Sequence, residues 1–229
     1  ILATPPHLSD GKSIPPKADR LVVDIGMSAE TARRKLNYGD RITLDGPLTP
    51  LLGDRVAAAS LDDRAGCAAV IGAAKLLREC AAAEISVALV SQEEVGSAGA
   101  ATAAYALAPD FAFAVDVSFG STPDDRPEDC AEIGKGPMIG YAPGLDIVMT
   151  QVLAETAAEE KIPFQREVMG GDTGTDADSI AGAGAGVPTA LLSIPLRYMH
   201  TPAEVVDLAD VEAVSRLMAA YIRKEGAAQ

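Results

Sequence analysis

Short apolar runs alternate with alanine-rich stretches from about residue 58 onward, and this alternation constrains the fold of the 229-residue chain more than any other feature. The apolar runs RVAAASL, ISVALVSQ, FAFAV and TALLSIPLRYM, which begin at residues 55, 85, 111 and 189, predict β-strands. Helices are predicted between and after them, over 64–82, 98–107, 146–161, 177–185 and 209–224. Strands that alternate with helices are typical of an α/β fold with a parallel or mixed sheet.

The first 57 residues differ in sequence pattern from the rest of the chain. Six prolines interrupt short β-like pieces at 20–26 and 41–46, and one helix is predicted over 28–36 with Ser28 as its N-cap. This pattern predicts part of a small β-rich domain over residues 1–57, followed by an α/β domain over 58–229.

Each predicted strand is followed by a residue that can bind a metal or transfer a proton: Asp62, the pair Glu93 and Glu94, Asp116, and His200. Open α/β sheets bind ligands beyond the carboxyl ends of their strands, so these residues are expected to converge. Taken singly, each has a structural alternative, because an Asp before a helix is a good N-cap and a His often only ends a strand. Together, carboxylates and an imidazole suit a hydrolytic metal centre.

The adjacent carboxylates of Glu93 and Glu94 can divide the chemistry of such a centre. One would bind a metal while its neighbour takes a proton from water, and the break at Val95-Gly96 would let both face one site. An exposed acidic pair at the end of a strand is the alternative.

Charge and composition exclude several classes of partner. The net charge of −14, without a stripe of Lys and Arg, argues against nucleic acid. No apolar run approaches the length that spans a membrane, so no membrane partner is expected. The three cysteines have no CxxC spacing, which favours a reducing cytoplasm over a disulfide framework or a zinc knuckle.

Five segments of the chain resemble the M42 family of metallo-aminopeptidases, which includes glutamyl and tetrahedral aminopeptidases. They are SLDDRAG (60–66), VSQEEVGSAGA (90–100), AVDV (114–117), GGDTGTDAD (170–178) and VPTALLSIPLRYMHTPAEVV (187–206). The resemblance implies a three-layer α/β/α metallopeptidase domain carrying a small β-barrel domain, of which residues 1–57 would be a part. It also implies a dodecameric homo-oligomer that releases N-terminal residues from peptides.

The resemblance also implies roles for the residues at the strand ends. Asp62 would bridge two divalent metal ions, Glu94 and His200 would bind one of them, and Asp116 the other. Glu93 would be the general base. Zinc is the first expectation for both ions, with cobalt or manganese as alternatives.

One departure from the family concerns a His-x-Asp motif near the N-terminus, whose His completes the second metal site. The remaining histidine here, His7, lies in PPHL and does not match that motif. The chain also begins Ile-Leu-Ala without Met, so we expect an N-terminally incomplete enzyme that is inactive as given. A related hydrolase of amides or acyl amino acids, or a non-catalytic assembly protein with the same fold, is the alternative function.

Overall fold

The computed structural model describes residues 21–80, 83–123, 125–126 and 130–228, and the chain divides into two compact units at Thr43 and Leu44. In the first unit, helix α1 (Ala29–Lys35) confirms the helix predicted over 28–36. The Oγ atom of Ser28 accepts a hydrogen bond from Thr31 N at 3.2 Å, as expected of an N-cap. Residues 21–26 and 41–46 form no strand apart from a bridge residue at Leu21, so the barrel assignment of 1–57 stays a prediction.

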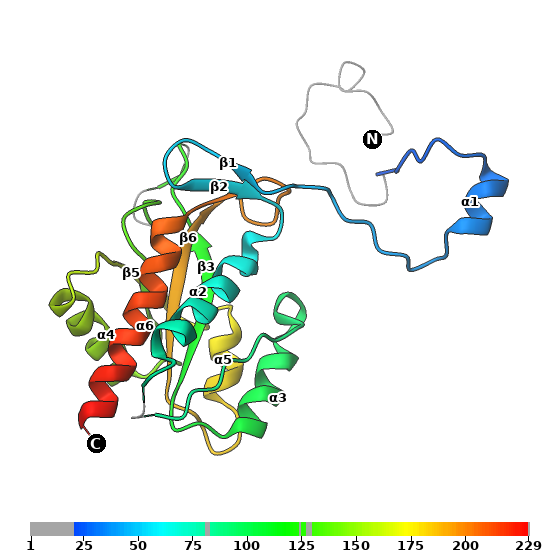
Figure 1. Cartoon of the computed structure of the whole chain (residues 1–229). Coiled ribbons are helices and arrows are strands. Elements are labelled where there is room, and N and C mark those ends of the chain that lie inside the picture. Colours follow the sequence, from blue (N-terminus) through cyan, green and yellow to red (C-terminus); the bar gives the residue numbers. More distant parts are fainter. Residues whose placement is uncertain (1–20, 81–82, 124, 127–129, 229) are drawn as a thin grey trace. The chain divides into compact units, whose positions relative to one another are not determined.

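The second unit contains one mixed sheet built around strand β6 (Thr189–Arg197) (Figure 1). Strand β3 (Ala112–Phe119) runs parallel along one side of β6, in register from Ala112 opposite Thr189 to Phe119 opposite Leu196. The other side of β6 pairs antiparallel with β4 (Met138–Tyr141) and β7 (Glu204–Asp207). The sheet continues from β4 to β5 (Gln165–Val168), and from β7 through β2 (Arg55–Ala58) to β1 (Thr49–Pro50).

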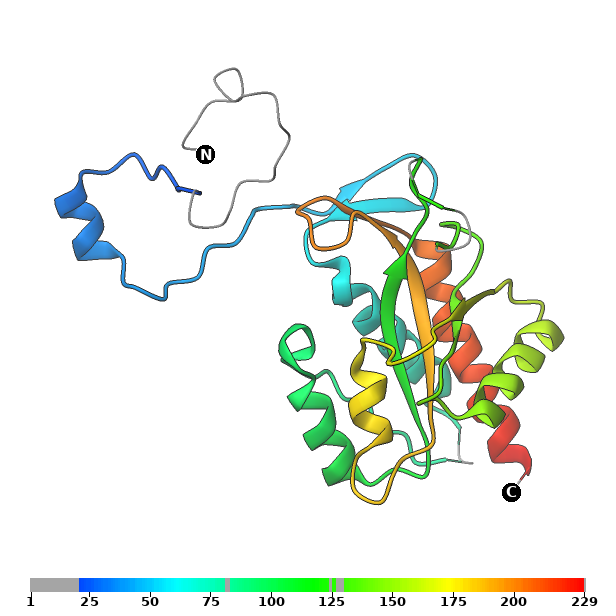
Figure 2. The same ribbon diagram turned by 180° about the vertical axis from the view of Figure 1, so that it is seen from behind.

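Helices cover both faces of this sheet, which confirms the three-layer α/β/α fold. One face carries α2 (Leu61–Leu77), α4 (Ile147–Glu159) and α6 (Leu208–Ala228) (Figure 1). Their core includes alternate residues of β6, namely Ala190, Leu192, Ile194 and Leu196. The opposite face carries α5 (Asp176–Ala181), which packs on β3 and β6, and α3 (Ala98–Leu107), which packs on α5 (Figure 2).

In the second unit the helix predictions are confirmed with shifts of a few residues, whereas the strand predicted from residue 85 is wrong. Residues 85–92 form no strand and have no ladder partner among the described residues. They end at Gln92, whose φ is 71°, and lead into the short 3₁₀ helix η3 (Glu93–Val95). The side chains of Val87 and Leu89 are consequently exposed, at 43% and 57%. The apolar sequence specifies a strand, but a strand forms only where a neighbour accepts and donates its backbone hydrogen bonds.

Two further details differ from the sequence prediction. Asp116 lies inside β3, which continues to Phe119, instead of following its end. Helix α2 begins at Leu61 rather than at 64, although the backbone of Asp62 and Asp63 is not helical and the peptide between them is cis. No helix within the described residues is long and apolar enough to cross a membrane.

Candidate metal centre

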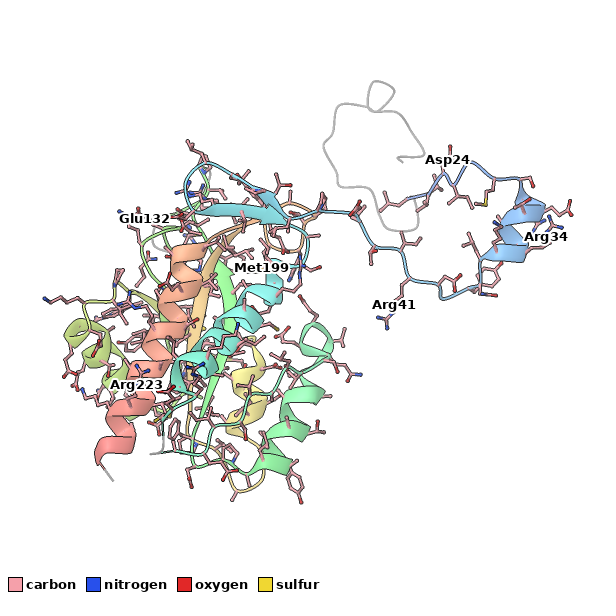
Figure 3. All side chains as sticks on the ribbon, in the orientation of Figure 1. Asp24, Arg34, Arg41, Glu132, Met199 and Arg223 are labelled. Carbon is pink, nitrogen blue, oxygen red and sulfur yellow. The ribbon has the colours of Figure 1, made fainter. Side chains whose placement is uncertain are left out.

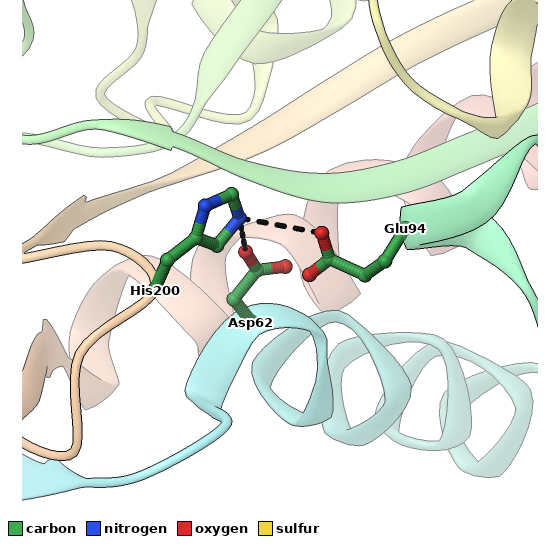
Figure 4. Close-up of side chains that lie close together, drawn as sticks. All are labelled: Asp62, Glu94 and His200. Atoms are coloured by element: carbon green, nitrogen blue, oxygen red, sulfur yellow. Dashed lines mark ion pairs between the residues drawn. The ribbon is translucent and has the colours of Figure 1, made fainter. Parts of the chain in front are cut away.

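Three side chains with potential metal-ligand atoms lie close together, those of Asp62, Glu94 and His200 (Figure 4). The Nε2 atom of His200 lies 3.1 Å from Asp62 Oδ2 and 3.3 Å from Glu94 Oε2. One potential ligand atom from each residue lies within 4.8 Å of the other two. Two ligands bound at zinc distances in a tetrahedral site are roughly 3.4 Å apart. The donor set and its spacing therefore fit a divalent metal ion.

Turns in the left-handed backbone region present these three side chains. Asp62 follows Ser60, whose φ is 53°, and Glu94 follows Gln92, whose φ is 71°. His200 itself has a φ of 61°, in the turn that connects β6 to β7. Residues other than glycine seldom adopt this conformation, so the surrounding structure must hold each turn in place.

All five residues singled out in the sequence line one cleft of about 500 Å³. Asp116 and Glu93 share this cleft but lie outside the group of three ligand atoms. Met199, which is labelled in Figure 3, lies in the turn before His200 and also lines the cleft. His7 lies outside the described residues.

Burial and crowding of carboxylates raise several pKa values in the cleft. Burial, followed by the charge of Glu94, raises the pKa of Asp62 to about 6. Burial raises the pKa of Asp116 to about 7, with Glu93 adding to the effect, although a hydrogen bond from Val117 N opposes it. Burial and then Asp116 raise the pKa of Asp63 to about 9. The same negative charges that disfavour ionisation favour the binding of a divalent cation.

The pKa of Glu93 is also raised, first by burial and then by the charges of Asp176 and Glu94. A carboxylate whose pKa moves towards neutrality is better suited to accept and return a proton. Glu93 thus differs from Glu94 in position, because only Glu94 belongs to the three-ligand group.

Sequence reasoning missed two carboxylates at this centre. Glu167 on β5 lines the cleft, where it accepts hydrogen bonds from the hydroxyls of Ser118 and Ser193, the latter at 2.6 Å. Glu204 is buried and accepts backbone N–H groups from the turns that carry Asp62 and His200. Its place four residues after His200, within the same motif, was the available signal for Glu204. The sequence analysis contained no signal for Glu167, because the strand that carries it was not predicted.

Comparison with known proteins places these features in a family. The family model of the M42 glutamyl aminopeptidases matches residues 1–217. A lysyl aminopeptidase of Pyrococcus furiosus is 36% identical over 96% of this chain and 65% of its own length. A glutamyl aminopeptidase of Lactococcus lactis is 29% identical over 95% of this chain and 63% of its own length. The chain thus spans less than two thirds of the length of these relatives.

Solved structures of aminopeptidases are also similar to this chain. An aminopeptidase from the archaeon Desulfurococcus kamchatkensis superimposes with a TM-score of 0.81 at 33% identity, covering 96% of this chain and 63% of that one. The TET1 peptidase of Pyrococcus horikoshii, which can assemble into a tetrahedron or a large octahedral shell, gives a TM-score of 0.76 at 31% identity. That match covers 95% of this chain and 66% of the TET1 chain.

Proposed function

Because the chain belongs to the M42 glutamyl aminopeptidase family, we propose that its cleft releases N-terminal residues from peptides by metal-dependent hydrolysis. The observation that carries this proposal is the convergence of Asp62, Glu94 and His200 in a cleft that also contains Glu93 and Asp116. Relatives of 29–36% identity carry aminopeptidase names, which supports the same reaction class.

In the proposed centre, Asp62, Glu94 and His200 would hold one divalent ion through their carboxylate and imidazole groups. Asp116, together with Asp62, would hold a second ion. Such ions lower the pKa of water and polarise the carbonyl of the scissile peptide bond. Zinc is our first assignment, and cobalt or manganese would suit the same ligands.

Glu93 moves the proton in this proposal. Its carboxylate accepts a proton from the attacking water and then delivers it to the amine that leaves. The raised pKa of Glu93 supports this role, because a base with a very low pKa accepts a proton poorly.

We further propose that the protein is a cytoplasmic homo-oligomer, up to a dodecamer. Support comes from TET relatives that form large shells, one of them described as a dodecamer. The shorter length of this chain relative to those proteins makes assembly a property to measure on the protein expressed from its complete gene.

Hydrolysis of a panel of aminoacyl p-nitroanilides and unblocked peptides, with the protein expressed from its complete gene, tests the reaction. We expect metal-dependent cleavage of substrates with a free α-amino group and none of their N-acetylated counterparts. Cleavage of N-acyl amino acids instead would identify the related amide hydrolase. Bound metal without hydrolysis of either class would identify a non-catalytic assembly protein.

A further inference from the structure

One buried carboxylate connects the two turns that present metal ligands. Glu204, the first residue of β7, is 2% exposed. Its Oε2 atom accepts hydrogen bonds from Leu61 N at 2.7 Å and from Asp62 N at 3.1 Å. Its Oε1 atom accepts a hydrogen bond from His200 N at 2.8 Å. A single side chain thus joins the backbone of Asp62 to that of His200, which are far apart in sequence.

Both turns need such support. Ser60 and His200 have positive φ values, 53° and 61°, although neither is a glycine. This conformation is unfavourable for residues with a Cβ atom and persists only where neighbouring interactions fix it. The hydrogen bonds to Glu204 involve the His200 amide and the two amides that follow Ser60.

We propose that Glu204 is a positioning residue, which holds Asp62 and His200 at the separation that one divalent metal ion requires. This inference rests on the proposed metal centre. Glu204 acts through the backbone, because both of its oxygens already accept N–H groups. A carboxylate is needed, since an amide would turn an NH₂ group towards one of the two turns and leave that turn without an acceptor.

The chain provides a matched control at Asp210. This carboxylate is also buried, at 1% exposure, and accepts backbone hydrogen bonds from Gly134 N at 2.6 Å and Gly136 N at 2.8 Å. Asp210 does not line the cleft. Glu204→Gln and Asp210→Asn each replace a carboxylate that holds backbone amides, but only Glu204 is bonded to the turns that carry metal ligands.

Titration of the metal-free 229-residue chain with Co²⁺, followed by calorimetry and by the visible absorption of cobalt, tests the inference. We expect both variants to lower Tm. Glu204→Gln should raise the Kd for cobalt about 10- to 100-fold, a typical loss when a group that orients a metal ligand is removed. Asp210→Asn should leave the Kd within about twofold of the parent value. An unchanged Kd in Glu204→Gln, or an equal loss in both variants, would overturn the proposal.

Glu204→Asp provides a second test if Glu204→Gln does not fold. It keeps the charge, but its side chain is one methylene shorter and reaches the two turns less well, so we expect a Kd above that of the parent. Parent-like affinity in a folded Glu204→Asp variant would overturn the positioning role when Glu204→Gln is unfolded. A parent chain that binds no cobalt would instead overturn the proposed metal centre itself.

Discussion

Glu93 and Glu94 are adjacent in the chain, yet their side chains have different surroundings in the cleft. Glu94 Oε2 lies 3.3 Å from His200 Nε2, whereas Glu93 lies outside the group of potential ligands. The short helix η3 explains why both residues still line the cleft, because it breaks the strand alternation that would send the two side chains to opposite faces. Substitution of Glu93 should therefore have a different effect on metal binding and activity from substitution of Glu94.

Replacement of Glu93 by Gln should abolish most turnover while leaving metal binding nearly intact. The amide keeps the shape of the side chain but cannot accept a proton, and general bases typically contribute about 10²–10⁴-fold. Measurement of kcat together with metal content, on the protein expressed from its complete gene, checks this expectation. Near-normal kcat with bound metal would remove Glu93 from the mechanism.

Replacement of Glu94 by Ala should remove metal as well as activity. The variant leaves only Asp62 and His200 in the three-ligand group, and two protein ligands bind a divalent ion weakly. Metal analysis after dialysis tests this prediction. Glu93→Gln, at the adjacent position, is the control and should keep its metal. A full metal content in Glu94→Ala would show that the roles of the two residues are exchanged.

At the scale of elements, the sequence predicted the helices and the central strands well, because their signals are local. The apolar run of β6 and the helical spacing of α6 are visible without knowledge of their neighbours. The segment 85–92 shows the limit of such reasoning, since its apolar residues find no ladder partner among the described residues. The link that Glu204 makes to the start of α2 was equally hidden, because two of its three hydrogen-bond partners, Leu61 N and Asp62 N, lie in a segment that only the folded chain brings near.

The contact between α2 and α6 depends on the absence of a side chain at Gly72. A Cβ atom at this position would lie 2.5 Å from Ser215 Oγ and 3.2 Å from Ser215 Cβ. Ser215 Oγ cannot move away freely, because it donates a hydrogen bond to Ala69 O at 2.9 Å. Close packing at this position thus explains why a glycine occurs inside α2 despite its low helix propensity.

Gly72→Ala should therefore lower Tm in the parent chain. In a Ser215→Ala background the closest contact, with Ser215 Oγ, disappears. The higher helix propensity of alanine relative to glycine, up to about 1 kcal/mol, should then offset most of the loss in unfolding free energy that Gly72→Ala causes. A double-mutant cycle of unfolding free energies measures the coupling between the two positions. Additive effects of the two substitutions would contradict the packing argument.

For the whole molecule, the raised pKa values predict how the stability of the metal-free chain depends on pH. Asp62, Asp116 and Asp63 have folded-state pKa values of about 6, 7 and 9, all above the ordinary 3.8 of the unfolded chain. Their contribution to stability is therefore complete below pH 3.8 and is lost as the pH rises through the folded-state values.

We accordingly expect the Tm of the metal-free chain, measured in chelator, to fall between pH 5 and pH 9. Asp63→Asn should reduce the part of this fall between pH 7 and pH 9, because the amide is neutral throughout and still offers an oxygen to Gly66 N. A Tm that rises across this range, or an unchanged slope in Asp63→Asn, would contradict the assignment of the raised pKa values.

The number of metal ions bound is the remaining property of the whole chain that the geometry predicts. The described residues bring three potential ligand atoms together once, at Asp62, Glu94 and His200. A second ion would have Asp116, whose Oδ1 atom already accepts the N–H of Val117 at 2.8 Å, and a shared oxygen of Asp62. Two such oxygens are too few for tight binding, whereas three protein ligands with water suit a zinc site.

We therefore predict that the metal-free 229-residue chain binds one divalent ion tightly and a second one weakly. A tightly bound ion at 100 times its Kd should stabilise the fold by about 2.7 kcal/mol, because it binds the folded state alone. Calorimetric titration gives the stoichiometry, and thermal unfolding with and without metal gives the stabilisation. His200→Ala should abolish both effects, while two tight sites in the parent chain would contradict the prediction.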